Sequence, residues 1–177
     1  SFRSSTSFYT VDEELQMLDS YLYIMRIRYA DGFEVRYDVA EDCRSCRLPR
    51  LTLQPIVENA LDHGFADMGD ELGQLVIQAA RQGDFLCLEV EDNGCGMTPE
   101  QVDAVLRGRP LGADTGHGIG LKNVLARLRL HFGGESNLLI ESVPGQGTRI
   151  TIRLPWQAVA PQTTKEELSH DPNPDCR

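Results

Sequence analysis

Four short stretches of this 177-residue chain carry residue types that can hold a nucleotide. The first is Leu51 to Gly64 (LTLQPIVENALDHG), which reads as a helix with Asn59 at its middle. Three glycine-rich stretches follow: DNGCGM (Asp92 to Met97), GHGIGL (Gly116 to Leu121) and GQGT (Gly145 to Thr148). A nucleotide site can be formed by three such features together: an amide on a helix, a carboxylate at the start of one glycine loop, and a second glycine loop before a helix.

The DNGCGM stretch suits recognition of a base. A carboxylate at a strand end, such as that of Asp92, can accept a hydrogen bond from the amino group of adenine. Gly94 and Gly96 let the backbone pass close beneath the base. Because ordinary turns are also rich in Asp, Asn and Gly, this pattern is weak by itself.

The GHGIGL stretch suits phosphates. Its glycines expose backbone N–H groups and lead into a helix N-terminus, which attracts negative charge, and Lys122 follows directly. The stretch lacks the GK[ST] ending of a P-loop and follows no strand, so neither the Walker nor the Rossmann pattern applies. On this motif alone, a plain loop before a helix explains the glycines equally well.

The amide oxygen of Asn59 is a suitable ligand for Mg²⁺, which prefers oxygen and completes its shell with water and substrate phosphates. Thr148 offers a hydroxyl at the start of a strand, near the expected base. Taken alone, Glu58, Asn59, Asp62 and His63 would be read as the solvated face of a helix.

Composition narrows the possible functions. The net charge is −10 and the sequence pI is about 4.8, without a basic cluster, so we expect no nucleic-acid partner. No apolar run is long enough to span a membrane, and the N-terminus lacks a signal-peptide core. Five cysteines without regular spacing fit a reducing cytosol, so we expect a cytoplasmic chain. Cys43 and Cys46 supply only two of the four ligands of a structural zinc, which makes a metal or redox role the less favoured reading.

The hydrophobic pattern predicts an α+β fold: a two-layer sandwich with a mixed sheet of about five strands, helices on one face, and one preceding helix. The second helix should begin near Gln54, because Pro55 is tolerated in a first turn. The expected elements are a helix from Thr10, a strand over 33–39, a helix over 49–65, strands over 75–80 and 85–91, a mobile lid over 97–115, a helix over 118–132, and strands over 138–142 and 148–154.

The first helix carries a heptad-like apolar stripe. Its members are Val11, Leu15, Leu18, Leu22, Met25 and Tyr29. The favoured interpretation is that the stripe packs against the body of the same domain, and the alternative is that it continues an upstream dimer helix.

Together, these stretches resemble the GHKL (Bergerat-fold) ATP-binding domain shared by histidine kinases, gyrase, Hsp90 and MutL. The correspondence places Asn59 in the N box, Asp92, Gly94 and Gly96 in the G1 box, Gly116, Gly118 and Gly120 in the G2 box, and Gly147 and Thr148 in the G3 box. More narrowly, LQPIVENA, GIGLKNVLARL and the leading EELQMLDSYLYIMRIRY resemble the LytS-like sensor histidine kinases. The similarity runs from about Thr10 to Pro155.

The resemblance implies ATP and Mg²⁺ as cofactors. Asn59 would ligate magnesium with Glu58 beside it as the second catalytic residue, Asp92 would hold the adenine amino group, and His63 would flank the nucleotide. The other implied nucleotide contacts are Asp62, Gly94, Gly96, Met97, Gly116, His117, Gly118, Ile119, Gly120, Leu121, Lys122 and Thr148.

The resemblance also implies partners. The full kinase would pass the γ-phosphoryl group to a histidine on an upstream dimerisation domain and then to a response regulator, and the parent would be a membrane-anchored homodimer. Residues 1–30 would be the helix at the end of the dimerisation or linker region, 31–155 the ATP-binding domain, and 156–177 a polar, disordered tail. None of His63, His117, His131 and His170 has a phosphoacceptor context, so we expect a catalytic fragment.

Two positions depart from the family pattern. Hydrolytic members place a glutamate four residues before the magnesium asparagine, where this chain has Pro55, and this favours phosphotransfer over hydrolysis. Kinases often have lysine three residues after that asparagine, where this chain has Asp62, whose charge would repel phosphate. The alternatives are a gyrase- or MutL-type ATPase and a degenerate domain that only binds nucleotide or partners.

Overall fold

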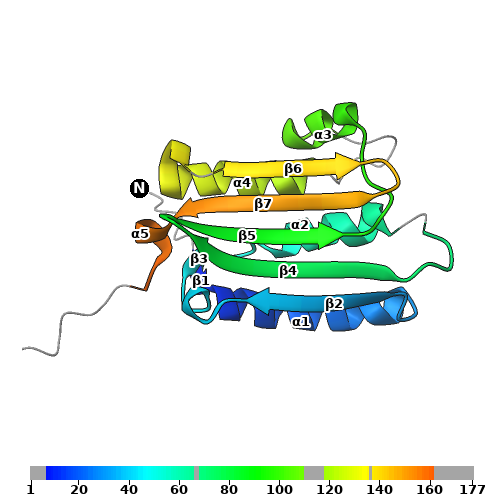
Figure 1. Ribbon diagram of the computed structural model, residues 1–177, viewed down its shortest axis with the longest axis horizontal. Helices are drawn as coiled ribbons and strands as arrows, with labels where there is room; N and C mark the ends of the chain where they lie inside the picture. The colour runs from blue at the N-terminus through cyan, green and yellow to red at the C-terminus, as the bar shows by residue number, and fades with distance from the viewer. Residues whose placement is uncertain (1–6, 66–67, 110–117, 136, 162–177) are drawn as a thin grey trace, which may run out of the picture.

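The computed structural model describes residues 7–65, 68–109, 118–135 and 137–161. A five-stranded sheet forms one layer, and α1, α2 and α4 form the other, behind the sheet in Figure 1. The predicted α+β sandwich with helices on one face is confirmed. The elements in chain order are β1 (Phe8–Thr10), α1 (Val11–Arg28), β2 (Phe33–Val39), a 3-10 turn (Glu41–Cys43), β3 (Arg47–Pro49), α2 (Gln54–Asn59), a π-helix (Ala60–Gly64), β4 (Gly73–Gln82), β5 (Phe85–Asp92), α3 (Pro99–Leu106), α4 (Gly118–Phe132), a 3-10 turn (Gly133–Glu135), β6 (Asn137–Val143), β7 (Gly147–Pro155) and α5 (Trp156–Val159).

The strands lie in the order β2-β4-β5-β7-β6. β2 runs parallel to β4, whereas the β4–β5, β5–β7 and β6–β7 pairs are antiparallel, so the sheet is mixed as predicted. Asp92, the last residue of β5, pairs with Thr148 near the start of β7, and Thr148 pairs in turn with Ser142 of β6. The topology therefore brings two of the glycine-rich stretches to the same end of the sheet.

The hydrophobic core lies between the sheet and the helices. Alternate strand residues such as Ile77, Leu88 and Ile152 are buried against the helical layer, while most of the residues between them are partly or fully exposed. The outer face of the sheet is charged: Arg149 forms ion pairs there with Glu89 and Glu91. This one-sided burial is why the strands alternate in hydrophobicity.

Helix α1 begins where the sequence predicts. Thr10 and Glu13 form the capping box, with Thr10 N–H donating to Glu13 Oε2 (2.7 Å) and Glu13 N–H to Thr10 Oγ1 (3.1 Å). Val11, Leu18 and Leu22 are buried in the same core as the sheet. The interpretation that the stripe packs against the domain body is thus confirmed, whereas the assignment of residues 1–30 to the end of a dimerisation or linker region stays a prediction.

A buried carboxylate ties α1 to the segment that precedes α2. Glu14 is only 3% exposed, and its oxygens accept hydrogen bonds from the backbone N–H groups of Leu51 (2.6 Å), Thr52 (2.8 Å) and Leu53 (3.0 Å). Hydrogen bonds to an ionised acceptor are stronger than those between neutral groups. Glu14 therefore fixes the entry of α2 relative to α1.

The structure adds elements that the periodicity did not predict. The predicted lid over 97–115 contains α3, which starts at a second capping box formed by Thr98 and Gln101 with Pro99 in its first turn. The predicted tail begins with α5, whose Val159 is fully buried. Both corrections have the same cause: a short helix with one or two buried residues is too short to show periodicity. The rest of the lid (110–115) and of the tail (162–177) lies outside the described residues.

Candidate functional site

The helix that carries Asn59 changes its hydrogen-bond register at its centre. It begins at Gln54 with Pro55 in the first turn, as predicted, and becomes a π-helix from Ala60, where Phe65 N–H donates to Ala60 O (3.0 Å). Such π-turns are rare and occur often at functional sites. Asn59 lies at the junction of the two registers.

The amide of Asn59 has an unused acceptor. Asn59 is 7% exposed, and its Oδ1 atom is buried without a hydrogen-bond partner among the described residues. A buried polar atom in this state costs free energy unless a ligand or water satisfies it. An oxygen of this kind fits a hard cation such as Mg²⁺.

Glu58, the other predicted catalytic residue, is half-buried and held by its own helix. Gln54 Nε2 donates to Glu58 Oε1 (2.8 Å), one turn away. On the α1 side, burial raises the pKa of Tyr21, and the charges of Glu58 and Asp62 raise it further. The Glu58 carboxylate is therefore near α1 as well as adjacent to Asn59.

The far end of the π-helix packs directly on the end of β5. A Cβ atom on Gly64 would lie 2.9 Å from Asp92 Oδ1, and a Cβ atom on Gly94 would overlap the Gly64 carbonyl. Cys95 N–H donates to Gly64 O (2.8 Å). Only glycine allows backbones to approach this closely. The contact fixes the distance between the asparagine helix and the carboxylate.

Asp92 is buried (6% exposed) at this junction, and its Oδ1 accepts from Gly94 N–H (2.9 Å). Desolvation raises the pKa of Asp92 to about 6, although the backbone N–H groups of Gly94 and Thr148 oppose the shift. A buried carboxylate held near its ionisation point is typical of binding and catalytic sites.

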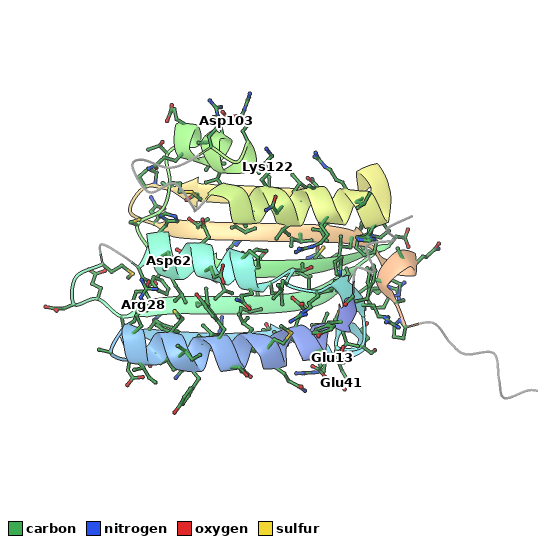
Figure 2. The ribbon with its side chains drawn as sticks, turned by 180° about the vertical axis from the view of Figure 1, so that it is seen from behind. Glu13, Arg28, Glu41, Asp62, Asp103 and Lys122 are labelled. Carbon is green, nitrogen blue, oxygen red and sulfur yellow. The ribbon has the colours of Figure 1, made fainter. Side chains whose placement is uncertain are left out.

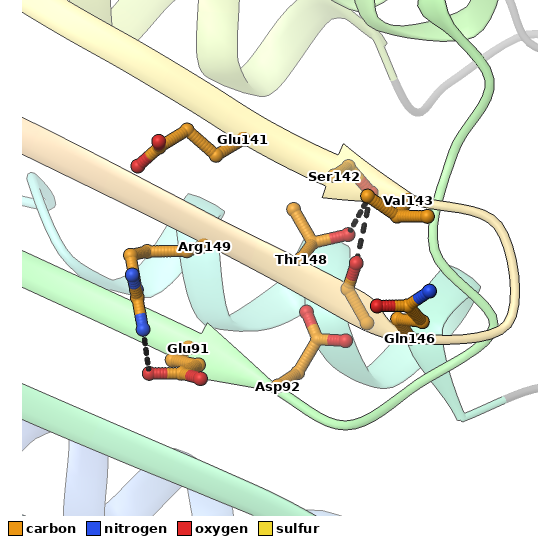
Figure 3. Close-up of a pocket in the computed structure, with 9 residues that line it drawn as sticks. Glu91, Asp92, Glu141, Ser142, Val143, Gln146, Thr148 and Arg149 are labelled. Carbon is orange, nitrogen blue, oxygen red and sulfur yellow. Dashed lines mark hydrogen bonds and ion pairs between the residues drawn. The ribbon is translucent and has the colours of Figure 1, made fainter.

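Asp92 and Thr148 also line a pocket of about 190 Å³ at this end of the sheet, together with Ser142 and the β6–β7 turn (Figure 3). Ser142 Oγ lies 2.8 Å from Thr148 Oγ1, 3.0 Å from Gly147 O and 2.7 Å from Met97 N. Met97, predicted as a nucleotide contact, is 5% exposed. The start of β7 and the loop before α3 thus meet at the Ser142 hydroxyl of β6.

The structure turns Asp62 toward α1. Tyr29 Oη donates to Asp62 Oδ1 (3.1 Å), and Arg28 Nη1 lies 3.9 Å from the same oxygen (Figure 2). The Asp62 carboxylate thus has partners on α1, and its effect on phosphate binding stays a prediction. The carbonyl of the neighbouring His63 accepts from Cys95 Sγ (3.0 Å), which ties it to the loop after β5.

Only part of the predicted phosphate loop is described. Gly116 and His117 lie outside the described residues, as does the side chain of Ile119. α4 begins at Gly118 as predicted, Leu121 is buried, and Lys122 is exposed with its side chain against Gly108 after α3. A Cβ atom on Gly120 would lie 3.4 Å from Pro55 Cβ, so the start of α4 lies beside the start of α2. Gly96 has a positive φ (66°) in the loop after Asp92.

The sequence analysis did not predict the roles of four residues: Glu14, Tyr29, Gln54 and Ser142. Gln54 bonds to Glu58, one helical turn away, and the other three form hydrogen bonds with segments far away in the chain. The four-residue spacing of Gln54 and Glu58 was a usable signal. The others had none, because their partners are defined by tertiary packing.

Among the described residues, no cluster of three or more His, Cys, Asp or Glu side chains is arranged to hold a metal ion, the Cys43–Cys46 region included. Among the same residues, no helix is both long and apolar enough to cross a membrane.

An α+β sandwich that carries a buried carboxylate, glycine-rich loops and an amide with an open acceptor at one end defines a nucleotide-binding domain of the ATPase type. The chain belongs to the histidine kinase-, DNA gyrase B- and HSP90-like ATPase family, whose pattern matches residues 47–158. ATP is therefore the nucleotide implied for this site.

Curated relatives include the sensor histidine kinases BtsS and YesM and the sensor protein LytS. BtsS of Escherichia coli K12 is 34% identical over 152 residues (86% of this chain, 25% of that protein). YesM of Bacillus subtilis is 35% identical over 146 residues (82% and 24%), and LytS of Staphylococcus saprophyticus is 31% identical over 161 residues (91% and 26%). The chain thus spans about a quarter of the length of these relatives.

Solved structures agree on the fold. The catalytic domain of histidine kinase ThkA superposes with a TM-score of 0.61 at 16% identity, covering 84% of this chain and 94% of that one. The Acinetobacter baumannii histidine kinase AdeS gives 0.59 at 17% identity, covering 84% and 67%.

Proposed function

We propose that this chain is the ATP-binding catalytic part of a sensor histidine kinase in a two-component system. One observation carries the proposal. The junction of the π-helix with the end of β5 holds the open acceptor of Asn59 on a segment whose last residue, Gly64, touches the buried carboxylate of Asp92. A nucleotide needs an oxygen ligand for the cation at its phosphates and a hydrogen-bond acceptor for its base. Asn59 and Asp92 would supply these two groups from segments that pack on each other.

In the proposed complex, the Asp92 carboxylate would accept a hydrogen bond from the adenine amino group, and Asn59 Oδ1 would be a ligand of Mg²⁺. The ion supplies charge neutralisation of the phosphates. Backbone N–H groups at the start of α4 and the Lys122 ammonium are the proposed phosphate contacts. The other predicted contacts, Asp62, His63, Met97 and the GHGIGL residues, stay proposals.

The arrangement supports phosphotransfer over hydrolysis. The position where hydrolytic relatives carry a general base is Pro55, which packs beside Gly120 and has no proton acceptor. Glu58 is the nearest alternative base, and Gln54 holds its carboxylate one turn along the helix. We therefore propose that the γ-phosphoryl group goes to a histidine of an upstream dimerisation domain and then to a response regulator, in a homodimeric, membrane-anchored parent.

The proposal is tested by calorimetric titration of the chain with a non-hydrolysable ATP analogue and Mg²⁺. Saturable binding is expected, with at least a tenfold loss in Asn59→Ala and Asp92→Ala, each of which removes a polar contact made by a buried group. Asn137→Ala, at the opposite end of β6, is the matched control and should bind normally. Absence of binding by the unmutated chain at millimolar analogue would contradict the proposal and favour a degenerate domain.

A steady-state phosphate-release assay separates the kinase from the alternative ATPase. A phosphotransfer domain without its acceptor is expected to release phosphate far below one turnover per second, the low end of typical enzyme rates. Sustained release at or above about 1 s⁻¹ that disappears in Asn59→Ala would support the ATPase instead.

A further inference from the structure

Ser142 occupies a central position that neither the family pattern nor the motifs assign. It lies on β6 directly opposite Thr148 of β7, and Thr148 lies opposite Asp92 of β5. Ser142, Thr148 and Asp92 therefore form one row across three adjacent strands, at the end of the sheet where the pocket opens (Figure 3).

The Ser142 hydroxyl has three partners and a single hydrogen. Met97 N–H donates to Ser142 Oγ (2.7 Å), so the oxygen already accepts one hydrogen bond. The hydroxyl hydrogen can be donated to Gly147 O (3.0 Å) or to Thr148 Oγ1 (2.8 Å), but not to both. The acceptor that receives the Ser142 hydrogen therefore determines whether the Thr148 hydroxyl can donate a hydrogen bond to a ligand.

If Ser142 donates to Gly147 O, the Thr148 hydroxyl donates back to Ser142 and can only accept from a ligand. If Ser142 donates to Thr148 Oγ1, the hydrogen of Thr148 is available to the pocket. Because Thr148 is 6% exposed, its hydroxyl has few other partners, so the direction of this bond matters.

The second state matches adenine. Adenine presents an amino donor beside a ring-nitrogen acceptor, and the row then offers the Asp92 carboxylate as acceptor and the Thr148 hydroxyl as donor. Guanine presents a carbonyl acceptor beside a ring N–H donor, which is the reverse order. A site built to hydrogen-bond one pattern rejects the other strongly, because its buried polar groups would be left unpaired.

We propose that Ser142 is a positioning and specificity residue: by donating to Thr148 Oγ1 and accepting from Met97 N–H, it orients the Thr148 hydroxyl beside Asp92 for an adenine nucleotide. This inference rests on the proposed function and deepens it. Ser142 acts through Thr148 and the Met97 backbone, so it need not touch the nucleotide.

The test compares ATP-analogue and GTP-analogue affinities by calorimetry for the unmutated chain, Ser142→Ala and Ser142→Thr. Ser142→Ala should weaken ATP-analogue binding about tenfold, the effect of losing one hydrogen bond, with little change for the GTP analogue. The ATP-to-GTP preference should therefore fall by a similar factor, and Ser142→Thr, which restores a hydroxyl, should recover most of it.

Thr151→Val, on the same strand as Thr148, is the matched control, since its hydroxyl faces Glu89 on the charged outer side of the sheet. Its ATP-to-GTP preference should be unchanged. If Ser142→Ala does not fold, Ser142→Cys provides a second variant of similar volume with a weak donor, and the same loss of preference is expected.

An unchanged ATP-to-GTP preference in Ser142→Ala would overturn the inference. An equal loss of affinity for both analogues would also overturn it, because it would indicate a purely structural role for Ser142. These outcomes leave the proposed function intact as long as the unmutated chain binds the ATP analogue. If the unmutated chain binds neither nucleotide, the proposed function itself fails.

Discussion

The carboxylate of Asp92 lies against the α-carbon of Gly64, so closely that a Cβ atom on Gly64 would be 2.9 Å from Asp92 Oδ1 and 3.2 Å from its Cγ. The last residue of the π-helix and the last residue of β5 thus share one contact, which relates the helix of Asn59 to the carboxylate of Asp92. The first prediction follows from it.

Gly64→Ala is expected to displace the Asp92 side chain, because Gly64 and Asp92 are both buried and the added Cβ atom would meet the short Asp92 carboxylate. We expect a loss of stability of about 1–3 kcal/mol, as for other overpacked sites, and at least a tenfold loss of ATP-analogue affinity. Thermal unfolding and calorimetry measure the two effects. Gly134→Ala, where an added Cβ atom meets nothing within 4 Å, is the control, and equal behaviour of both variants would refute the role of the contact.

Asp92 should make the unmutated protein less stable as the pH rises. Its pKa is raised to about 6, above the ordinary 3.8, so the folded state favours the protonated form. The stability that this group contributes is present below about pH 4 and is lost as the pH rises through 6. Relative to Asp92→Asn, the unmutated protein should lose up to about 3 kcal/mol of unfolding free energy between pH 4 and pH 7, from about 1.4 kcal/mol per pKa unit.

Urea unfolding of both proteins across this pH range measures that difference, with exposed Asp70→Asn as the control that should run parallel to the unmutated protein. A constant difference between the unmutated protein and Asp92→Asn would show that Asp92 does not titrate in this window.

Nucleotide should protect Cys95 from alkylation. Burial raises the pKa of Cys43 to about 12 and of Cys46 to about 11, and it also raises the pKa of Cys87, so these thiols should react slowly. Cys95 is exposed in the loop between Asp92 and Met97. In a Cys176→Ser background, mass spectrometry should show iodoacetamide labelling at Cys95 that saturating ATP analogue slows several-fold.

In the same Cys176→Ser background, Asn59→Ala should abolish the protection of Cys95 by the ATP analogue, because this variant is expected to bind the analogue weakly. The comparison tests whether the protection depends on bound nucleotide. Labelling at an equal rate with and without analogue, under conditions where calorimetry detects binding, would place the nucleotide away from this loop.

Tyr29 should hold the π-turn. Because Phe65 N–H bonds to Ala60 O, Leu61 O loses its α-helical partner. The single hydrogen of the Tyr29 hydroxyl is shared between Leu61 O (3.0 Å) and Asp62 Oδ1 (3.1 Å). Tyr29→Phe keeps the edge contact with Phe33 but removes this donor. We expect a stability loss of about 1 kcal/mol and faster hydrogen exchange over residues 60–65.

Tyr37→Phe is the matched control, since the Tyr37 hydroxyl donates to Asp19 of α1 and not to the π-helix. It should cost similar stability but leave exchange over residues 60–65 unchanged. Identical exchange in the two variants would mean that Tyr29 does not support the turn.

Much of the fold was predictable because its signals are local. The Thr10–Glu13 capping box set the start of α1, Pro55 set the start of α2, and alternating hydrophobicity marked the sheet strands. The Thr98–Gln101 capping box of α3 is also a local signal, but the eight-residue helix that follows it is too short to show periodicity and lies within the predicted lid. The three-residue strands β1 and β3 had no local signal, since they are defined by pairing with each other.

The sequence by itself determined which residue types could hold a nucleotide and in what order they occur, because motifs such as ENALDHG and DNGCGM are contiguous. Tertiary structure alone decided how they meet: the π-turn after Asn59, the orphaned oxygen of its amide, the turn of Asp62 toward Tyr29 and the row from Ser142 to Asp92. The physical reason is that hydrogen-bond register and burial depend on strands and helices far apart in the chain, whose packing free energy no local pattern contains.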